Sequence, residues 1–236
     1  MMSMNESAPI EGPFRLYGCW RSTCTHRAIL ALRFHDIDFH YSPIDLTARE
    51  QEQPEFLAIS PDAQVPVLAV GDRVLTQSLA IVSFIESITE SADTKPGAPA
   101  LFPAEPETRA HALSICERVS SFIQPMTLPG AIRRSIQSHF SRADDAIFSE
   151  QAKGFIEAML TDNLRKLDGV FARHSGPFAL GQAVSVADVF VYPQLLGAQR
   201  MGFDLAPFAR LSSQTEAMAR LAFVKAADPL ALPDAP

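Results

Sequence analysis

The chain has 236 residues, of which 47% are hydrophobic and 20% are charged. This composition is typical of one large or two modest globular domains, and it excludes a disordered, collagen-like or coiled-coil chain. A formal net charge of −7 argues against a protein that binds nucleic acid or anionic membranes through bulk charge. An anionic ligand would therefore need a local cluster of basic groups.

The cysteines and the first residues of the chain both indicate in which compartment the protein is found. Cys19, Cys24 and Cys116 form neither a CxxC motif nor a Cys/His metal spacing, so we expect reduced thiols, no bound metal and a cytoplasmic protein. The polar residues 1–13 lack the regions of a signal peptide, and we expect a short disordered arm there. No apolar run reaches the ~18 residues of a membrane span, so neither membrane nor nucleic acid is an expected partner.

The first half of the chain reads as β-α-β followed by β-β-α. Apolar–polar alternation and a hairpin signal predict four strands: 14–18, 38–44, 64–70 and 73–76. Polar residues 21–23 open an apolar helix after the first strand, and Pro43 marks an end or an edge of the second. The turn Gly71-Asp72 indicates a hairpin, and Ser78 is expected to cap the helix that follows.

Prolines and glycines crowd residues 91–106 and predict a linker, after which helical patterns dominate. The expected order is an arm, an α/β domain, the linker, an all-α bundle and a tail: 1–13, 14–90, 91–106, 107–228 and 229–236. Two apolar stripes support the bundle: Ala112, Cys116, Val119 and Ile123, then Ile156, Leu160, Leu164, Leu167 and Phe171. Pro125 and Pro129 should end its first helix, and Pro193 should kink a later one.

One helix start in the second half carries a specific signal. Ser185 stands at the N-cap position, and Asp188 follows three residues later, which is the pattern of a capping box. The apolar residues 189–192 predict that this helix is buried. We interpret the box as structural, with a contribution of about 1 kcal/mol, and assign it no chemistry.

Chemistry is expected first at Ser22, Thr23 and Cys24, where a strand hands over to a helix. Unpaired N–H groups and the helix dipole favour an anion at such a turn. A hydroxyl or thiol there can donate to a bound thiolate or act as a nucleophile itself. The alternative is that Ser22 or Thr23 only caps the helix and Cys24 only packs.

Two further places could hold a peptide. Pro66 lacks the N–H of a strand ladder, so the edge at Val65 can accept an extended backbone, with a cis bond as the means. Gln77 and Ser78 put polar groups at a helix start, where a carboxylate binds well. Alternatively, Pro66 is a simple edge-strand proline and the second pair an ordinary cap. Together the three places match a small thiol peptide.

Four segments resemble the zeta class of glutathione transferases, which includes maleylacetoacetate and maleylpyruvate isomerases: LYGCWRSTCTHRAILAL, QVPVL, TQSLAIVSFIE and FALGQAVSVADVFVYPQL. The most specific part is a Ser-Ser-Cys-x-x-Arg type signature, here residues 22–27 with Thr23 as a conservative change. The resemblance extends from about Phe14 to Asp204. It implies a thioredoxin-like N-terminal domain, a helical C-terminal domain, a homodimer, and glutathione bound between the two domains.

The resemblance also implies roles for single residues. Ser22 would activate the glutathione sulfur beside Cys24, and Arg21 and Arg200 would bind the carboxylates of a maleyl substrate during cis-trans isomerisation. The expected glutathione-binding set is the signature turn, the strand start and the helix start: Ser22, Thr23, Cys24, Gln64, Val65, Pro66, Gln77 and Ser78. Gln51 and Gln53 are candidates for the glycine carboxylate.

The chain departs from the zeta isomerases after the proline of the first long helix. Those enzymes usually carry amide side chains there, whereas this chain has Met126-Thr127-Leu128, which predicts a more apolar second-substrate pocket. Two other functions stay open. One is an oxidoreductase or dehalogenating transferase that works through Cys24, which has no resolving cysteine in a CxxC motif. The other is a noncatalytic binding protein with this fold.

Overall fold

The computed structural model describes residues 12–91, 99–127 and 145–236. The chain forms two compact units, of which the first consists of residues up to 98 together with residues 226–236, and the second of residues 99–225. The change from one unit to the next falls within the predicted linker. The last residues of the chain, expected as the end of the bundle and a tail, cluster with the first unit.

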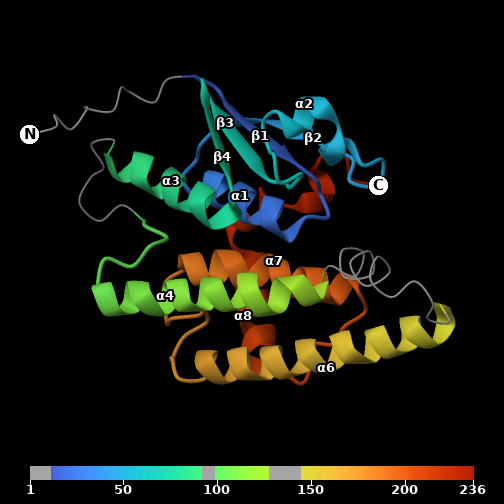
Figure 1. Ribbon diagram of the computed structural model, residues 1–236. Coiled ribbons are helices and arrows are strands. Elements are labelled where there is room, and N and C mark those ends of the chain that lie inside the picture. The colour runs from blue at the N-terminus through green and yellow to red at the C-terminus, as the bar shows by residue number, and fades with distance from the viewer. Residues whose placement is uncertain (1–11, 92–98, 128–144) are drawn as a thin grey trace, which may run out of the picture. The chain divides into compact units, whose positions relative to one another are not determined.

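The first unit contains a four-stranded sheet in the order β2-β1-β3-β4 (Figure 1). The strands are β1 (Phe14–Gly18), β2 (Phe39–Pro43), β3 (Val67–Val70) and β4 (Arg73–Thr76). Strand β1 pairs with β2 in parallel and with β3 in antiparallel, and β3 and β4 form the predicted hairpin. All four predicted strands are confirmed, although β3 starts later than expected, at Val67, because Pro66 cannot donate to the ladder.

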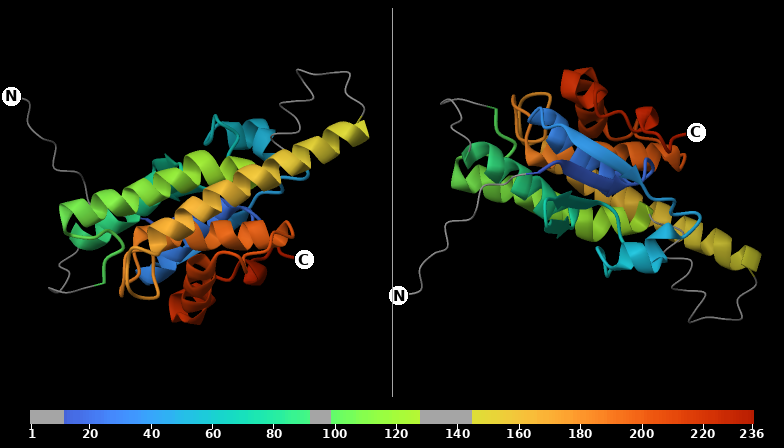
Figure 2. Two further views of the ribbon diagram at one scale, coloured as in Figure 1. Left: turned by 90° about the horizontal axis from the view of Figure 1, so that it is seen from below. Right: turned by 90° about the horizontal axis from the view of Figure 1, so that it is seen from above.

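Helices α1 (Thr23–Phe34) and α3 (Ser78–Ser91) lie side by side on one face of the sheet (Figures 1 and 2). Side chains alternate along a strand, so Leu16, which is fully buried, points to that face and Tyr17 to the other. The ring of Tyr17 meets Phe56 of α2 (Pro54–Leu57) edge-on, with 6.4 Å between centroids. This helix and η1 (Glu50–Glu52) were not predicted, because they are too short to show a period.

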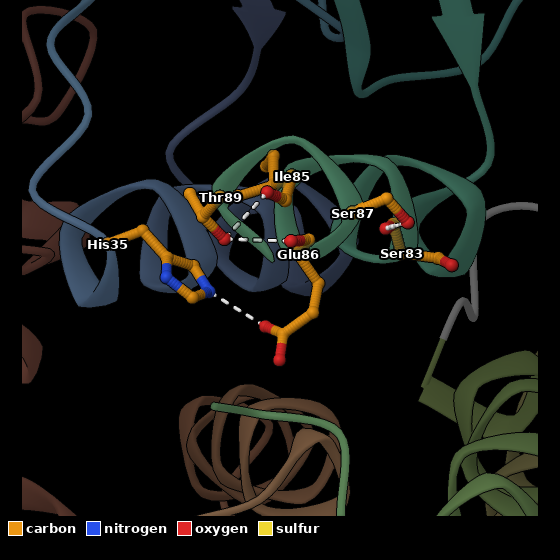
Figure 3. A network of polar contacts seen from close by, with 6 residues as sticks. All are labelled: His35, Ser83, Ile85, Glu86, Ser87 and Thr89. Atoms are coloured by element: carbon orange, nitrogen blue, oxygen red, sulfur yellow. Dashed lines mark hydrogen bonds and ion pairs between the residues drawn. The ribbon is translucent and has the colours of Figure 1, made fainter. Parts of the chain in front are cut away.

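A buried hydrogen bond between a histidine and a glutamate connects α1 to α3 (Figure 3). His35, at the C-terminal cap of α1, lies with Nε2 2.7 Å from Oε2 of Glu86 on α3, and the two side chains are 8% and 4% exposed. The Thr89 hydroxyl donates to the backbone carbonyls of Ile85 and Glu86. The pair holds the two helices in one relative position, and their N-termini carry Ser22 and Ser78.

The second unit is helical, as predicted. Among the described residues, its α-helices are α4 (Pro106–Arg118), α6 (Asp145–Phe171), α7 (Val186–Arg200), α8 (Ala209–Arg220) and α9 (Ala222–Lys225). Every residue of the two predicted apolar stripes is buried. Within residues 12–91, 99–127 and 145–236, no helix is both long and apolar enough to cross a membrane.

One proline of the second unit acts differently from expectation. Pro125 does not end the helical run, because α4 passes into a π-helical turn, η2 (Val119–Ile123), and then into the 3-10 turn η3 (Gln124–Thr127) that contains the proline. Pro129 lies outside the described residues. Pro193 sits inside α7, which continues to Arg200.

The capping box at the start of α7 is confirmed, and it is larger than predicted. The fully buried carboxylate of Asp188 accepts from the N–H and the hydroxyl of Ser185, both at 3.0 Å, and from the Ala179 N–H at 2.8 Å. The side-chain amide of Gln214 on α8 donates to it as well, at 3.1 Å. The carboxylate therefore joins α7 to a loop and to another helix.

Candidate functional site

The register of the sheet brings the predicted glutathione-binding segments to one end of it. Tyr17 pairs with Val67, and Val67 pairs with Thr76. The turn after β1, the residues before β3 and the residues after β4 therefore share an edge. Ser22, Val65 and Gln77 all lie within a few residues of that edge.

Ser22 occupies the N-cap of α1. Its Oγ accepts a hydrogen bond of 3.1 Å from the Thr25 N–H, and within the described residues this is the only hydrogen bond of the hydroxyl. A hydroxyl that accepts a helix N–H still has its proton to donate, and polarisation by the N–H strengthens it as a donor. The capping and the activating roles of Ser22 are thus compatible rather than alternatives.

The turn that carries Ser22 is tightly held. The buried Thr25 accepts the Cys19 N–H at 3.3 Å through Oγ1, and the Ser22 N–H donates to the Cys19 carbonyl at 2.9 Å. Gly18 makes this approach possible, because a Cβ on it would lie 2.3 Å from Cγ2 of Thr25 and 3.1 Å from the ring of Tyr41. Neither contact is the far end of a flexible chain.

We expect Gly18→Ala to destabilise the protein by roughly 1–3 kcal/mol, the usual cost of overpacking, and to weaken glutathione binding by displacing Ser22. Urea unfolding and calorimetric titration with glutathione measure the two effects. Thr25→Ser removes the clashing methyl group, so the double variant should recover part of the stability. Gly169→Ala, on a helix with open space around the added methyl, is the control. An equal loss in the control would contradict the steric explanation.

Arg27 connects Cys24 to the start of α3. Its side chain is fully buried, and its Nη1 lies 3.7 Å from Cys24 Sγ and 3.3 Å from Ser78 Oγ. Cys24 is half-buried, and all three cysteines of the chain are free. Arg27 stands in the signature, but sequence reasoning gave it no role, because nothing local shows that its side chain turns inward to α3.

The backbone just before β3 does not take part in the hydrogen bonds of the sheet. The Val65–Pro66 peptide bond is cis, as the resemblance implies, and β3 begins only at Val67. The N–H and C=O of the half-buried Val65 therefore lie outside the strand pairs. Gln64 is exposed, and its backbone N–H and carbonyl are both bonded to the Ser60 hydroxyl, at 3.3 and 3.0 Å.

The start of α3 differs by one residue from the prediction. Ser78 is the first residue of the helix and does not cap it, whereas the Gln77 carbonyl accepts the first helical hydrogen bond, from the Ile81 N–H. Gln77 has a φ of 68°, which costs a non-glycine residue on the order of 1–2 kcal/mol. Its side chain is exposed, and Ser78 is buried. Such strain is frequent at ligand sites.

The loop after β2 supports the same edge. The exposed Arg21 donates from Nη2 to Thr47 Oγ1 at 2.6 Å. Hydrogen bonds from the backbone N–H groups of Ala48 and Thr47 lower the pKa of Asp45 and keep the loop folded on this carboxylate. Gln51 is half-buried, and its Oε1 is buried without a hydrogen bond among the described residues.

Two candidate positions belong to the second unit. Arg200 is exposed at the last position of α7. Thr127 is in the segment that departs from the zeta pattern, and its hydroxyl accepts from the side-chain amide of the buried Gln194 on α7. A polar group is therefore present beside this segment, supplied by a residue that sequence reasoning missed. In the described part of the chain, no three metal-ligating side chains cluster.

Comparison with known proteins identifies the family of the chain. The profile of the family "Glutathione S-transferase, N-terminal domain" matches residues 12–87. The chain is 32% identical to a probable maleylacetoacetate isomerase of Caenorhabditis elegans, over 93% of this chain and 94% of that protein. The chain belongs to the glutathione S-transferase family, zeta class.

Two solved structures are similar along almost the whole chain. The maleylacetoacetate isomerase from Methylobacterium extorquens AM1, determined with malonate and glutathione, is 32% identical with a TM-score of 0.81, and the match covers 94% of this chain and 99% of that one. A bacterial maleylpyruvate isomerase of the zeta class is 25% identical with a TM-score of 0.82, and the match covers 94% of this chain and all of the other. Thioredoxin-like and helical parts, as predicted, are confirmed.

Proposed function

We propose that the protein is a glutathione-dependent isomerase that converts a cis maleyl diacid to its trans form. The observation that carries this is the Ser22 hydroxyl, which accepts the Thr25 N–H and keeps its own proton for a thiolate. The other polar groups at the same edge fit the tripeptide: the Val65 backbone suits the cysteinyl unit, and Gln77 and Ser78 suit the γ-glutamyl carboxylate.

We assign a separate role in the proposed reaction to each residue of the site. Glutathione, when bound, supplies a thiol that adds to a double bond and is eliminated after rotation about the resulting single bond. The Ser22 hydroxyl donates a hydrogen bond to the sulfur and so favours the anionic form of the thiol near neutral pH. Arg27 holds Ser78 in place, so that the α3 start faces the ligand as a fixed anion site. Thr23 and Cys24 complete the turn around the sulfur, and the exposed Gln64 is placed beside Val65.

The choice of substrate rests on the relatives. Proteins named maleylacetoacetate isomerase or maleylpyruvate isomerase resemble this chain over most of its length. We expect glutathione-dependent isomerisation of maleylacetoacetate or maleylpyruvate to be at least tenfold faster than conjugation of chlorodinitrobenzene. Parallel assays of the three substrates, with and without glutathione, test the proposal. Turnover of chlorodinitrobenzene alone would leave a transferase and exclude the isomerase.

Arg21 and Arg200 are proposed to bind the substrate carboxylates. Because hydrogen bonds to charged groups contribute about 1.5–3 kcal/mol, we expect Arg21→Ala and Arg200→Ala to raise the KM for the maleyl diacid roughly 10- to 100-fold. The KM for chlorodinitrobenzene, which has no carboxylate, should stay unchanged. Arg220, exposed at the end of α8, is the matched control. An equal loss with both substrates would assign these arginines to the fold instead.

The alternative chemistry at Cys24 has one supporting observation, the Arg27 guanidinium 3.7 Å from its sulfur. A thiol beside a buried cation is a candidate nucleophile. Cys24→Ala separates the two functions, because an isomerase that relies on Ser22 keeps its activity. Mass spectrometry after treatment with glutathione disulfide completes the test, since a Cys24 enzyme forms a mixed disulfide.

Two broader properties complete the proposal. A cytoplasmic location is supported by the three free thiols, which a reducing compartment preserves. A homodimer is supported by membership of this family. Light scattering behind a sizing column measures the mass in solution, and a particle of one chain would contradict the dimer.

A further inference from the structure

A carboxylate from the end of the chain touches the turn that presents Ser22. Asp234 lies in the C-terminal segment 226–236, which clusters with the first unit (Figure 1). Its Oδ2 accepts a hydrogen bond of 2.9 Å from the backbone N–H of Trp20, two residues before Ser22. The same oxygen accepts the hydroxyl of Tyr41 on β2 at 3.4 Å.

The contact supplies an acceptor for a backbone N–H of the turn. The N–H of Cys19 already donates to Thr25 and the N–H of Ser22 to the Cys19 carbonyl, so the turn is fixed from within at both ends. The Trp20 N–H between them points away from these partners and to Asp234. A part-buried N–H without an acceptor would cost about 1–3 kcal/mol, and the turn could relax to recover that cost.

Tyr41 is a suitable second partner. Burial, and next the negative charge of Asp234, raise the pKa of its hydroxyl, so the group stays protonated and continues to donate. Leu16 of β1 pairs with Tyr41 of β2, which places the tyrosine one strand away from the start of the turn. One carboxylate oxygen thus connects the edge strand, the turn and the C-terminal segment.

We propose that Asp234 is a positioning residue, which holds the turn after β1 so that Ser22 meets the sulfur of glutathione. The effect of Asp234 on the reaction rests on the proposed function, whereas its contact with the turn does not. It is also independent of local sequence, since the donor and the acceptor are 214 positions apart. The C-terminal segment then belongs to the glutathione site, although no residue of it needs to touch the ligand.

The tryptophan of the turn reports on the contact directly, because Trp20 is the only tryptophan of the chain. We expect Asp234→Ala to raise acrylamide quenching of its fluorescence about twofold and to raise the KM for glutathione about tenfold, since a displaced Ser22 loses a hydrogen bond to the thiolate, and such bonds to charged groups contribute about 1.5–3 kcal/mol. The KM for the maleyl substrate should change less than twofold. Melting temperature confirms that each variant is folded.

Two variants make the comparison strict. Asp234→Asn keeps one acceptor oxygen, and its amide nitrogen takes the place of Oδ1, which has no hydrogen bond within the described residues. It should therefore stay within twofold of the wild-type protein. Asp228 lies in the same segment, but its carboxylate accepts the Leu230 N–H and caps the short turn η4 (Pro229–Ala231). Asp228→Ala should leave quenching and the KM for glutathione unchanged.

The outcomes separate the contact from its consequence. Unchanged quenching in Asp234→Ala would show that the carboxylate does not hold the turn, and would overturn the inference whatever the enzyme does. Raised quenching with an unchanged KM for glutathione would overturn the positioning role, and so would an equal effect of Asp228→Ala. If the wild-type protein binds no glutathione, the proposed function fails, while the quenching comparison still decides the contact.

Discussion

Ser22→Asp is expected to fold as stably as the wild-type protein and to lose about 99% of its glutathione-dependent activity. An aspartate caps a helix as well as a serine does, because its carboxylate accepts the Thr25 N–H and favours the helix dipole. An ionised carboxylate, however, has no proton to donate and repels a thiolate. A loss of two pKa units in thiol activation corresponds to about 2.7 kcal/mol, which is a factor of about 100.

Ultraviolet titration of the bound thiol and urea unfolding measure the two properties separately. Ser22→Ala removes both the cap and the donor, so it should lose activity and also about 1 kcal/mol of stability. Ser22→Thr keeps both groups and serves as the control. If Ser22→Asp retains a low pKa for the bound thiol, the hydroxyl does not activate the sulfur, and the helix terminus alone has to account for the thiolate.

Asp188→Ala is expected to produce the largest loss of stability, about 3 kcal/mol or more, because each buried donor left without an acceptor costs about 1–3 kcal/mol. The variant leaves the N–H groups of Ala179 and Ser185 and the side-chain amide of Gln214 without their acceptor. The melting temperature should fall by roughly 10 °C in a chain of this size. Asp204→Ala, at an exposed loop carboxylate, is the control and should change stability by less than 0.5 kcal/mol, about the limit for ordinary surface sites.

The same residue gives a pH dependence with a defined sign. Burial raises the pKa of Asp188 above its ordinary value, despite the four hydrogen bonds that favour the ionised form. The folded state therefore binds the proton more tightly than the unfolded state, and the contribution of Asp188 to stability falls as pH rises from the unfolded pKa through the folded one. The stability of wild-type protein relative to Asp188→Asn should decrease with pH in that window. The opposite slope would show that the donors outweigh the burial.

Much of the first unit was predictable because its elements carry local signals. The four strands, the Gly71-Asp72 turn and the apolar stripes of the second unit follow from periodicity and turn chemistry, which depend on neighbours in the chain. The misses have local causes as well. Four-residue α2 is too short to show a helical period, and the shift of one residue at Ser78 depends on the left-handed conformation of Gln77, which residue type does not predict.

The sequence predicted a set of residues for the candidate site but not the contacts that connect them. The signature and the resemblance placed Ser22, Pro66 and Gln77 together, and the sheet register brings their segments to one edge. The inward turn of Arg27, the acceptor role of Thr25 and the contact of Asp234 had no local signal. Arg27 and Asp234 join segments that lie far apart in the chain, and the contact of Thr25 with Cys19 depends on how the turn folds back on β1.

The order of residues alone was sufficient for the fold class and the helical second half, and it predicted a set of residues for a thiol-peptide site, since hydrophobic spacing, capping and turn preferences act over a few positions. Tertiary structure decided how those residues are held: Gly18 against Thr25, Arg27 against Ser78 and the C-terminal carboxylate against the Trp20 N–H. The reason is physical. Close packing and the pairing of buried polar groups depend on which side chains lie near one another in space, and this proximity cannot be inferred from their separation along the chain.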